Sequence, residues 1–102
     1  MQEIFNYKDL KKILELKQHY LVLIYIYSDS IPYSNVESCL NKEHYNNNVT
    51  LLKINSNQKN IMDKLDVTTY PIVLLYKNNE LADEIYCSYN NIKTMLNNIL
   101  SY

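Results

Sequence analysis

Few side chains in this chain could act as nucleophiles or redox groups: two cysteines, Cys39 and Cys87, and two histidines, His19 and His44. A cysteine becomes reactive when its thiolate is stabilised by a neighbouring histidine, lysine or helix N-terminus. Neither histidine stands at a catalytic spacing from a cysteine, and the four residues do not form a metal-binding pattern. We therefore expect no metal site, and histidines that are solvated at helix ends.

The spacing around Cys39 is that of an amphipathic helix, with Val36 and Leu40 on the same apolar face. A free cysteine in such a position behaves as a small hydrophobic residue, which favours a buried structural role. A redox thiol is the alternative.

The elements that must position these residues belong to one domain, residues 1–102, of ordinary globular composition, with 47% apolar and 21% charged residues. The net charge of −1 and the absence of arginine argue against nucleic-acid binding. The longest apolar run, Leu21–Tyr27, is far short of the ~20 residues of a membrane span, and Met1-Gln2-Glu3 lacks the basic start of a signal peptide. We expect a soluble monomer without cofactors, cytoplasmic or nuclear, because two cysteines are too few for a secreted disulfide framework.

The first half of the chain reads as strand, helix, strand and helix. Asn6 is a predicted N-cap, with Asp9 three residues later as an approximate capping box. The continuous run Leu21–Tyr27 is typical of a strand buried on both faces of a sheet. The predicted elements are an edge strand at Gln2–Phe5, a helix with Leu10, Ile13, Leu14 and Lys17 on one face, the strand Leu21–Tyr27, and a helix from Ser28-Asp29-Ser30 through Pro32 to about Tyr45.

The second half continues the alternation and closes with a hairpin and a helix. Since the chain contains no glycine, the pair Asn78-Asn79 is the predicted hairpin turn. The predicted elements are strands at Val49–Asn55, Ile72–Tyr76 and Glu84–Cys87, a helix at Asn57–Leu65, and a terminal helix from Asn90 or Asn91 to Leu100. The order β-α-β-α-β-α-β-β-α predicts an α/β fold with a central mixed sheet and helices on both faces.

This order, at this length, resembles the thioredoxin fold. The segment from Asp66 through Pro71 to Glu80 is similar to the thioredoxin segment around its cis-proline and the hairpin that follows. Val49–Asn55 is similar to the central strand of that family, with Lys53 at the position of the family's lysine. The resemblance implies a cis peptide bond between Tyr70 and Pro71.

The family's active site, W-C-G-P-C, aligns with Asp29, Ser30, Ile31, Pro32 and Tyr33. Serine and tyrosine therefore replace both thiols, and Ile24 falls where the family has a buried carboxylate that assists proton transfer. Dithiol exchange needs a thiolate and a second, resolving thiol, and a serine hydroxyl is not ionised at neutral pH. We expect no catalytic residue at these degenerate positions.

The resemblance also implies a substrate groove, which in this chain would hold a protein segment. The groove residues expected from it are Asp29, Ile31, Tyr33, Tyr70, Pro71 and Cys87. The stretch Leu23–Pro32 is similar to phosducin-like proteins, whose thioredoxin-fold domain also lacks the cysteine pair and which act as adaptors and co-chaperones.

Two hypotheses follow. The chain is either a redox-silent module that binds protein segments, or a thiol oxidoreductase or redox sensor that acts through Cys39 or Cys87. Cys87 aligns with a glycine beside the active-site groove, so either a regulatory thiol or simple drift is open there. Lys53 matches a lysine that faces the family's buried carboxylate; with Ile24 at that position, Lys53 either extends to water or finds another acceptor. Asp29 either caps a helix or contacts a ligand.

Overall fold

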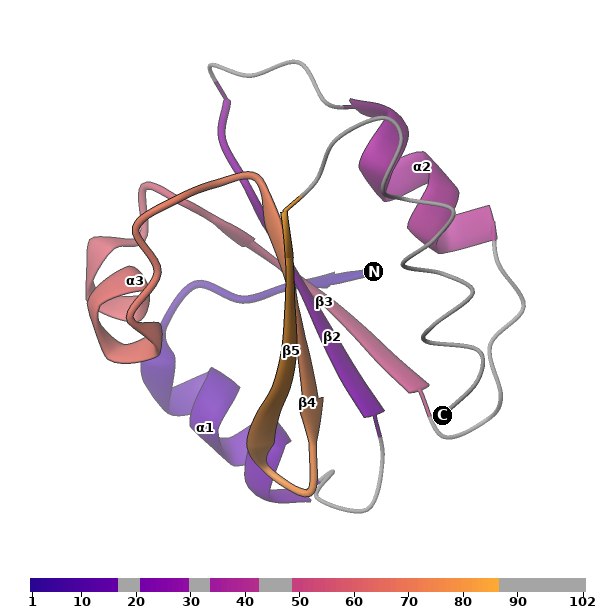
Figure 1. Cartoon of the computed structure of the whole chain (residues 1–102). Helices are drawn as coiled ribbons and strands as arrows, with labels where there is room; N and C mark the ends of the chain where they lie inside the picture. The colour runs from indigo at the N-terminus through magenta and orange to yellow at the C-terminus, as the bar shows by residue number, and fades with distance from the viewer. Residues whose placement is uncertain (17–20, 30–33, 43–48, 87–102) are drawn as a thin grey trace.

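The protein is described by a computed structural model that covers residues 1–16, 21–29, 34–42 and 49–86. The described residues form one five-stranded sheet and three helices (Figure 1). Along the chain these are β1 (Gln2–Glu3), α1 (Tyr7–Leu16), β2 (Leu21–Tyr27), α2 (Ser34–Lys42), β3 (Val49–Asn55), α3 (Lys59–Leu65), β4 (Ile72–Lys77) and β5 (Glu80–Tyr86).

The sheet has the strand order β1-β3-β2-β4-β5, so that β2 lies at its centre. β3 runs parallel to both β1 and β2, whereas β4 runs antiparallel to β2 and to β5. The central position explains why five consecutive residues of β2 are buried: a strand with neighbours on both sides and helices on both faces has no solvent side.

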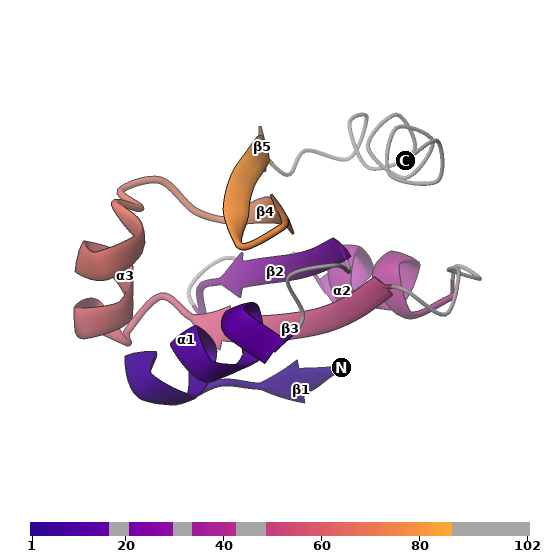
Figure 2. The same ribbon diagram turned by 90° about the horizontal axis from the view of Figure 1, so that it is seen from below.

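The helices form a layer on each face of the sheet. α1 and α3 cover one face, and α2 lies on the other (Figures 1 and 2). The sheet separates two apolar clusters. The larger one joins α1 and α3 to alternate residues of the strands, among them Ile24, Leu52 and Leu74. The smaller one joins Val36 and Leu40 of α2 to the opposite side chains, such as Leu23 and Val73.

The predicted order of elements is confirmed for the eight elements in the described residues, whereas the terminal helix at 90–100 lies outside them. The N-cap of α1 is confirmed as well. The Asp9 amide donates to Asn6 Oδ1 at 2.8 Å, and Asn6 Nδ2 donates back to Asp9 Oδ2 at 3.0 Å. Several boundaries differ: β1 ends at Glu3 rather than Phe5, α3 begins at Lys59 rather than Asn57, and β4 ends at Lys77 rather than Tyr76.

The hairpin turn is also confirmed, because Asn78 and Asn79 both have positive φ, 55° and 62°. Two left-handed residues in succession are the requirement of a tight turn between twisted antiparallel strands. The last strand, however, begins at Glu80 rather than at the predicted Glu84. A register shift opposite Leu75 and Tyr76 interrupts the polar–apolar alternation there, so the first half of β5 carries no strand pattern in the sequence.

Candidate functional site

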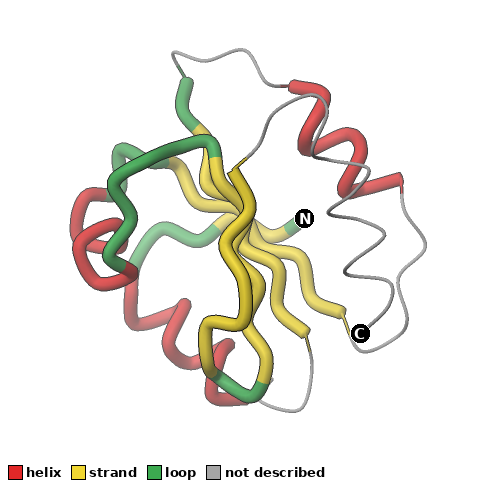
Figure 3. The backbone as a smooth tube through the Cα atoms, in the orientation of Figure 1, coloured by secondary structure: helices red, strands yellow, loops and turns green. Residues whose placement is uncertain are grey.

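The candidate site lies at one end of the sheet, where three strand ends meet. Because β2 and β3 are parallel, Tyr27 and Asn55 pair at the ends of both strands. Because β4 is antiparallel to β2, Ile26 pairs with Ile72, so β4 begins at the same end. The loops after β2 and β3 and the loop before β4 gather there in Figure 3.

This arrangement brings together three of the predicted groove residues: Asp29 after β2, and Tyr70 and Pro71 before β4. The peptide bond between Tyr70 and Pro71 is cis, as the resemblance implies. Tyr70 is half-buried and packs against the cluster beneath α1 and α3. The remaining predicted site residues, Ser30, Ile31, Pro32, Tyr33 and Cys87, lie outside the described residues.

Asn55 joins the two parallel strand ends. Its Nδ2 donates to Asp29 Oδ2 at 3.0 Å, and its Oδ1 accepts the Asn57 amide at 3.0 Å. A main-chain hydrogen bond of 2.8 Å from the Ser56 amide to the Tyr27 carbonyl lies beside them. The carboxylate of Asp29 is therefore held by the neighbouring strand end, in the position where the resemblance expects helix capping or ligand contact.

Lys53 is the centre of a second polar group, just below these loops. Its Nζ lies 2.9 Å from Glu37 Oε1 in the first turn of α2, and 3.9 Å from Glu3 Oε1 on β1. The ring of Tyr27 lies under the same ammonium group, 5.9 Å from its centroid. Glu3 also accepts a 2.5 Å hydrogen bond from the Tyr27 hydroxyl. We call these four residues, Glu3, Tyr27, Glu37 and Lys53, the Lys53 cluster.

The Lys53 cluster corrects one expectation from the sequence. Lys53 does not face the position of Ile24. The register pairs Ile24 with Leu52 and Tyr25 with Lys53, so the side chains of Ile24 and Lys53 lie on opposite faces of the sheet. Ile24 is fully buried beneath α1 and α3, and Lys53 finds other acceptors on the α2 face.

The environment of the Lys53 cluster shifts the pKa values of Tyr27 and Lys53. The pKa of Tyr27 is raised to about 12, first by burial and then by the hydrogen bond and charge of Glu3. The hydrogen bond from Lys53 to Glu37 raises the pKa of Lys53, with the charges of Glu37 and Glu3 acting in the same direction and burial opposing them. Both shifts favour the protonated forms, so Tyr27 and Lys53 keep their protons at neutral pH.

The described part of the site offers hydrogen-bonding groups, charged side chains and apolar contact. No group of three or more histidine, cysteine or acidic residues that could hold a metal ion occurs among the described residues. Within the described ranges, no helix is long and apolar enough to cross a membrane. On α2, Val36 and Leu40 are both buried, whereas the side chain of Cys39 lies outside the described part of the structure.

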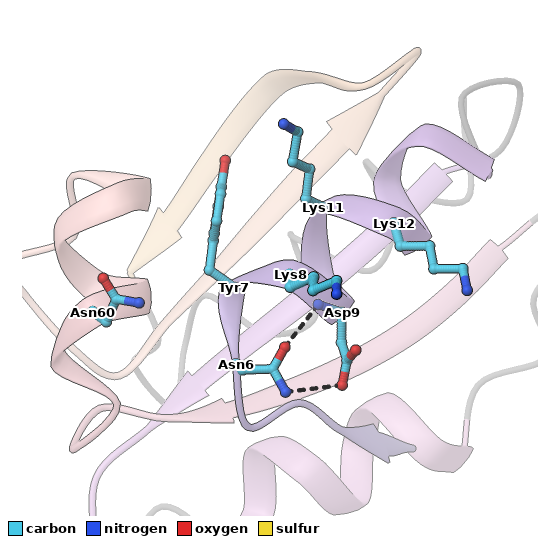
Figure 4. Close-up of a pocket in the computed structure, with 7 residues that line it drawn as sticks. All are labelled: Asn6, Tyr7, Lys8, Asp9, Lys11, Lys12 and Asn60. Carbon is cyan, nitrogen blue, oxygen red and sulfur yellow. Dashed lines mark hydrogen bonds between the residues drawn. The ribbon is translucent and has the colours of Figure 1, made fainter.

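A shallow depression lies away from this end, between α1 and α3 (Figure 4). Tyr7 and Asn60 stand on its two sides, and Lys64 of α3 lies 5.7 Å from the centroid of the Tyr7 ring. The lysines of α1 that line it point in different directions, with Lys11 and Lys12 directed away from each other. Their charges do not converge on one point, so the depression is not a built anion site.

The comparison with solved structures identifies the fold as that of thioredoxin. The chain is similar to mitochondrial thioredoxin 3 of Saccharomyces cerevisiae, with a TM-score of 0.82 and 19% identity over 100% of this chain and 95% of that one. It is similar to the thioredoxin of Fasciola hepatica, with a TM-score of 0.81 and 18% identity over 97% and 99% of the two chains.

A thioredoxin of Malassezia sympodialis gives a TM-score of 0.82 and 13% identity over 98% and 90% of the two chains. No protein-family model and no curated protein sequence matches the chain. At these identities the likeness defines the fold: the chain is a thioredoxin-fold protein that spans nearly the full length of these thioredoxins.

Sequence reasoning missed most of the polar contacts at this end. Glu3, Glu37 and Asn55 carry no motif, and each contacts a residue that is distant in the sequence. Tyr27 was assigned only to a buried strand, although its hydroxyl reaches Glu3. The one usable signal is Lys53 itself, since a lysine inside an apolar strand needs an acceptor or a route to water.

Proposed function

We propose that this chain is a thioredoxin-fold protein without dithiol redox activity, and that it binds a protein segment in the groove at the site end of the sheet. The groove residues are Asp29, Ile31, Tyr33, Tyr70, Pro71 and Cys87. The observation that carries the proposal is the residue pair at the positions of the two thiols, Ser30 and Tyr33. Neither side chain can form or resolve a mixed disulfide.

The interior of the sheet supports this proposal. The family's proton-transferring carboxylate has no equivalent at Ile24, which is fully buried among apolar side chains. Lys53 is engaged by Glu37 and Glu3 on the other face of the sheet. We call the apolar face of the sheet beneath α1 and α3 the dry face. With Ile24 in place of the carboxylate, its described residues offer no group there to exchange a proton with a thiol at residue 30 or 33.

A binding role can survive the loss of thiols because it uses the main chain. An extended segment pairs with free backbone groups in strand fashion, and side-chain pockets add selectivity. Tyr70 supplies an aromatic side chain beside Pro71 at the start of β4, and tyrosine contributes a large contact area with few rotatable bonds. The resemblance to phosducin-like proteins supports an adaptor or co-chaperone role. The proposed partner is a protein, bound by a cytoplasmic or nuclear monomer, with no nucleic acid or membrane involved.

The first experiment is a turnover assay with insulin and with a small aromatic disulfide. We expect no turnover above the uncatalysed thiol rate, since both thiol positions are occupied by other groups. The Cys39→Ser and Cys87→Ser variants are the matched controls. Turnover that either substitution abolishes would replace the proposal with a thiol oxidoreductase that acts through that cysteine.

Restoring the thiols tests the contribution of the interior. We expect the double variant Ser30→Cys/Tyr33→Cys to have weak activity, because Ile24 supplies no proton relay. Activity equal to that of an ordinary thioredoxin assayed alongside would contradict this reasoning about Ile24.

Binding in the groove is tested with the full chain as bait. We expect proteins captured by the wild type to be lost with Tyr70→Ala and kept with Phe5→Ala, in which an aromatic side chain that is 63% exposed is removed elsewhere. An amide chemical-shift titration with the captured protein should then perturb Tyr70 and Asp29. Perturbations confined to the opposite end of the sheet would contradict the groove as the binding site.

A further inference from the structure

Strand β5 presents apolar side chains to solvent on the face of the sheet that carries α1 and α3. Leu81 is 43% exposed and Tyr86 is 53% exposed. Glu84, also exposed, stands between them in the sequence. Tyr76 of β4 lies beside Leu81 in the sheet. We call these four residues, Tyr76, Leu81, Glu84 and Tyr86, the β5 surface.

The register shift in the hairpin is what places these residues on one face. Tyr86 pairs with Ile72, Glu84 with Leu74, and Leu81 with Tyr76. The three residues of β4 alternate along their strand and belong to or pack against the cluster beneath α1 and α3. In a regular strand, the odd spacing from Leu81 to Glu84 would place their side chains on opposite faces of the sheet. The extra residue at the register shift places both side chains on the same face.

Among the described residues, no helix lies over β5 (Figure 2). In Figure 2, α1 lies over the part of the sheet that contains β1 and β3, and α3 lies at the side, whereas β5 is at the far edge. Tyr76 is half-buried, and its pKa is raised by burial first, then by the neighbouring Tyr7 and Glu84. Tyr7 at the start of α1 and Tyr76 both pack against the cluster beneath α1 and α3, so the β5 surface borders this cluster at Tyr76.

The charged residues of β5 are all acidic. The strand contains Glu80, Asp83 and Glu84 and no basic residue. On the opposite face, Glu3 and Glu37 pair with Lys53. Asp83 Oδ1 accepts the main-chain amide of Glu84 at 2.8 Å, which occupies an edge donor and disfavours strand addition at this point. A partner would contact the face of β5 rather than its edge.

We propose that the β5 surface binds an extended segment of another protein in which a lysine or arginine is flanked by apolar side chains. The cation lies at Glu84, and the flanking side chains lie on Leu81 and Tyr86. Charge complementarity selects this occupant. A second copy of the chain would bring Glu84 against the same acidic strand, and like charges in direct contact are unfavourable. The proposal does not depend on the groove at Tyr70.

The experiment is an amide chemical-shift titration of the full labelled chain with a short blocked peptide in which leucine and arginine alternate. We expect saturable perturbations centred on Leu81, Glu84 and Tyr86. A matched peptide of alternating leucine and glutamate should give none. Glu84→Gln should weaken binding about fivefold, as expected for one exposed ion pair. Glu15→Gln, which removes the same charge from the exposed face of α1, should leave the affinity unchanged.

Three outcomes would overturn the proposal. One is equal weakening by Glu84→Gln and Glu15→Gln, which would mean that only the net charge attracts the peptide. We expect Leu81→Ser to weaken binding about tenfold because it removes apolar contact area. Unchanged binding by this variant is the second such outcome. The third is sedimentation of the free chain as a dimer that Glu84→Gln strengthens, which would assign the β5 surface to a second copy. Thermal unfolding of each variant checks that the substituted chains remain folded.

Discussion

The two faces of the sheet are built differently. Under α1 and α3, alternate residues of three strands join two helices in an apolar cluster around Ile24 and Leu52. Under α2 the described cluster is smaller, and toward the site end it gives way to the Lys53 cluster, in which Lys53, Glu3 and Tyr27 are partly buried. In the described residues, the core of one face is apolar, and the other face combines packing with charged hydrogen bonds.

This difference shows where the fold tolerates change. A close-packed apolar layer penalises an unpaired polar group heavily, whereas a half-exposed charged group can exchange partners with water at little cost. The carboxylate expected from the family is missing on the dry face, at Ile24. Carboxylates are instead found on the α2 face, where Glu3 and Glu37 satisfy Lys53. The face beneath α1 and α3 therefore supplies apolar packing, while Glu3, Glu37 and Lys53 supply polar contacts on the other face.

The strongest test of this contrast is Ile24→Asp, which returns a carboxylate to the position where the family has one. Lys53 lies on the opposite face, so the new group would be buried without a partner. We expect the free energy of unfolding to fall by at least about 4 kcal/mol in urea denaturation.

The matched control is Ile24→Ala, which removes the same packing without adding charge and should cost about 2–4 kcal/mol. An Ile24→Asp variant that is as stable as Ile24→Ala at neutral pH would mean that Lys53 or water reaches this position. The separation of the two faces would then be incorrect.

The next effect in size concerns the Lys53 cluster. Lys53→Met should lower the free energy of unfolding by about 1–2 kcal/mol, since it leaves Glu37 and Glu3 without their shared cation. A double-mutant cycle with Glu37→Gln should give a coupling energy of about 1 kcal/mol that decreases as salt is added. A coupling that is independent of salt would point to packing rather than charge.

The loss of stability at alkaline pH should reveal a further difference between the two faces. The pKa of Tyr27 is raised from 10.0 to about 12, by burial and then by Glu3. The folded state thus holds this proton more tightly than the unfolded chain does. The corresponding stability is complete below pH 10.0 and is lost as the pH rises through about 12. We expect Tyr27→Phe to make the fall in stability over this range shallower.

Tyr76 is the matched residue on the other face, where burial is the main cause of its raised pKa. Tyr76→Phe should also make the fall shallower. Glu3→Gln should reduce the effect of Tyr27→Phe and leave that of Tyr76→Phe unchanged. Equal responses of both tyrosines to Glu3→Gln would show that the hydrogen bond to Glu3 does not distinguish the two faces.

The dry half was predictable from sequence because its signals are local. The apolar run of β2, the helical spacing of Leu10 and Leu14, and the Asn78-Asn79 turn each depend on residues close together in the chain. The contacts of the α2 face join β1, β3 and α2 across long separations. Their partners are common surface residues, and their pairing follows from the register of parallel strands, which no short pattern encodes.

The hairpin lies between these two cases. Its turn was predictable because two asparagines tolerate positive φ in a chain without glycine. Its register was not, since one extra residue in β5 changes which side chains share a face. The exposure of Leu81 beside Tyr76 depends on that shift. The β5 surface is therefore visible only in the folded molecule.

The smallest effect that we predict concerns the end of α3, on the dry face. Asp66 ends this helix in a left-handed conformation, with φ 57° and ψ 43°. The amide of Val67 closes the end by donating to the Met62 carbonyl at 2.9 Å. A residue with a Cβ is disfavoured in this conformation, and a negative charge is unfavourable at a helix C-terminus. Asp66→Gly relieves both and keeps the main-chain hydrogen bonds, so we expect the free energy of unfolding to rise by about 1 kcal/mol.

The matched control is Lys64→Gly, two residues earlier and inside the helix, which should instead lower the free energy of unfolding by about 0.7 kcal/mol. Urea denaturation of both variants measures this reversal of sign. If Asp66→Gly is destabilising too, then the Asp66 side chain stabilises the helix end by a contact that outweighs its strained backbone.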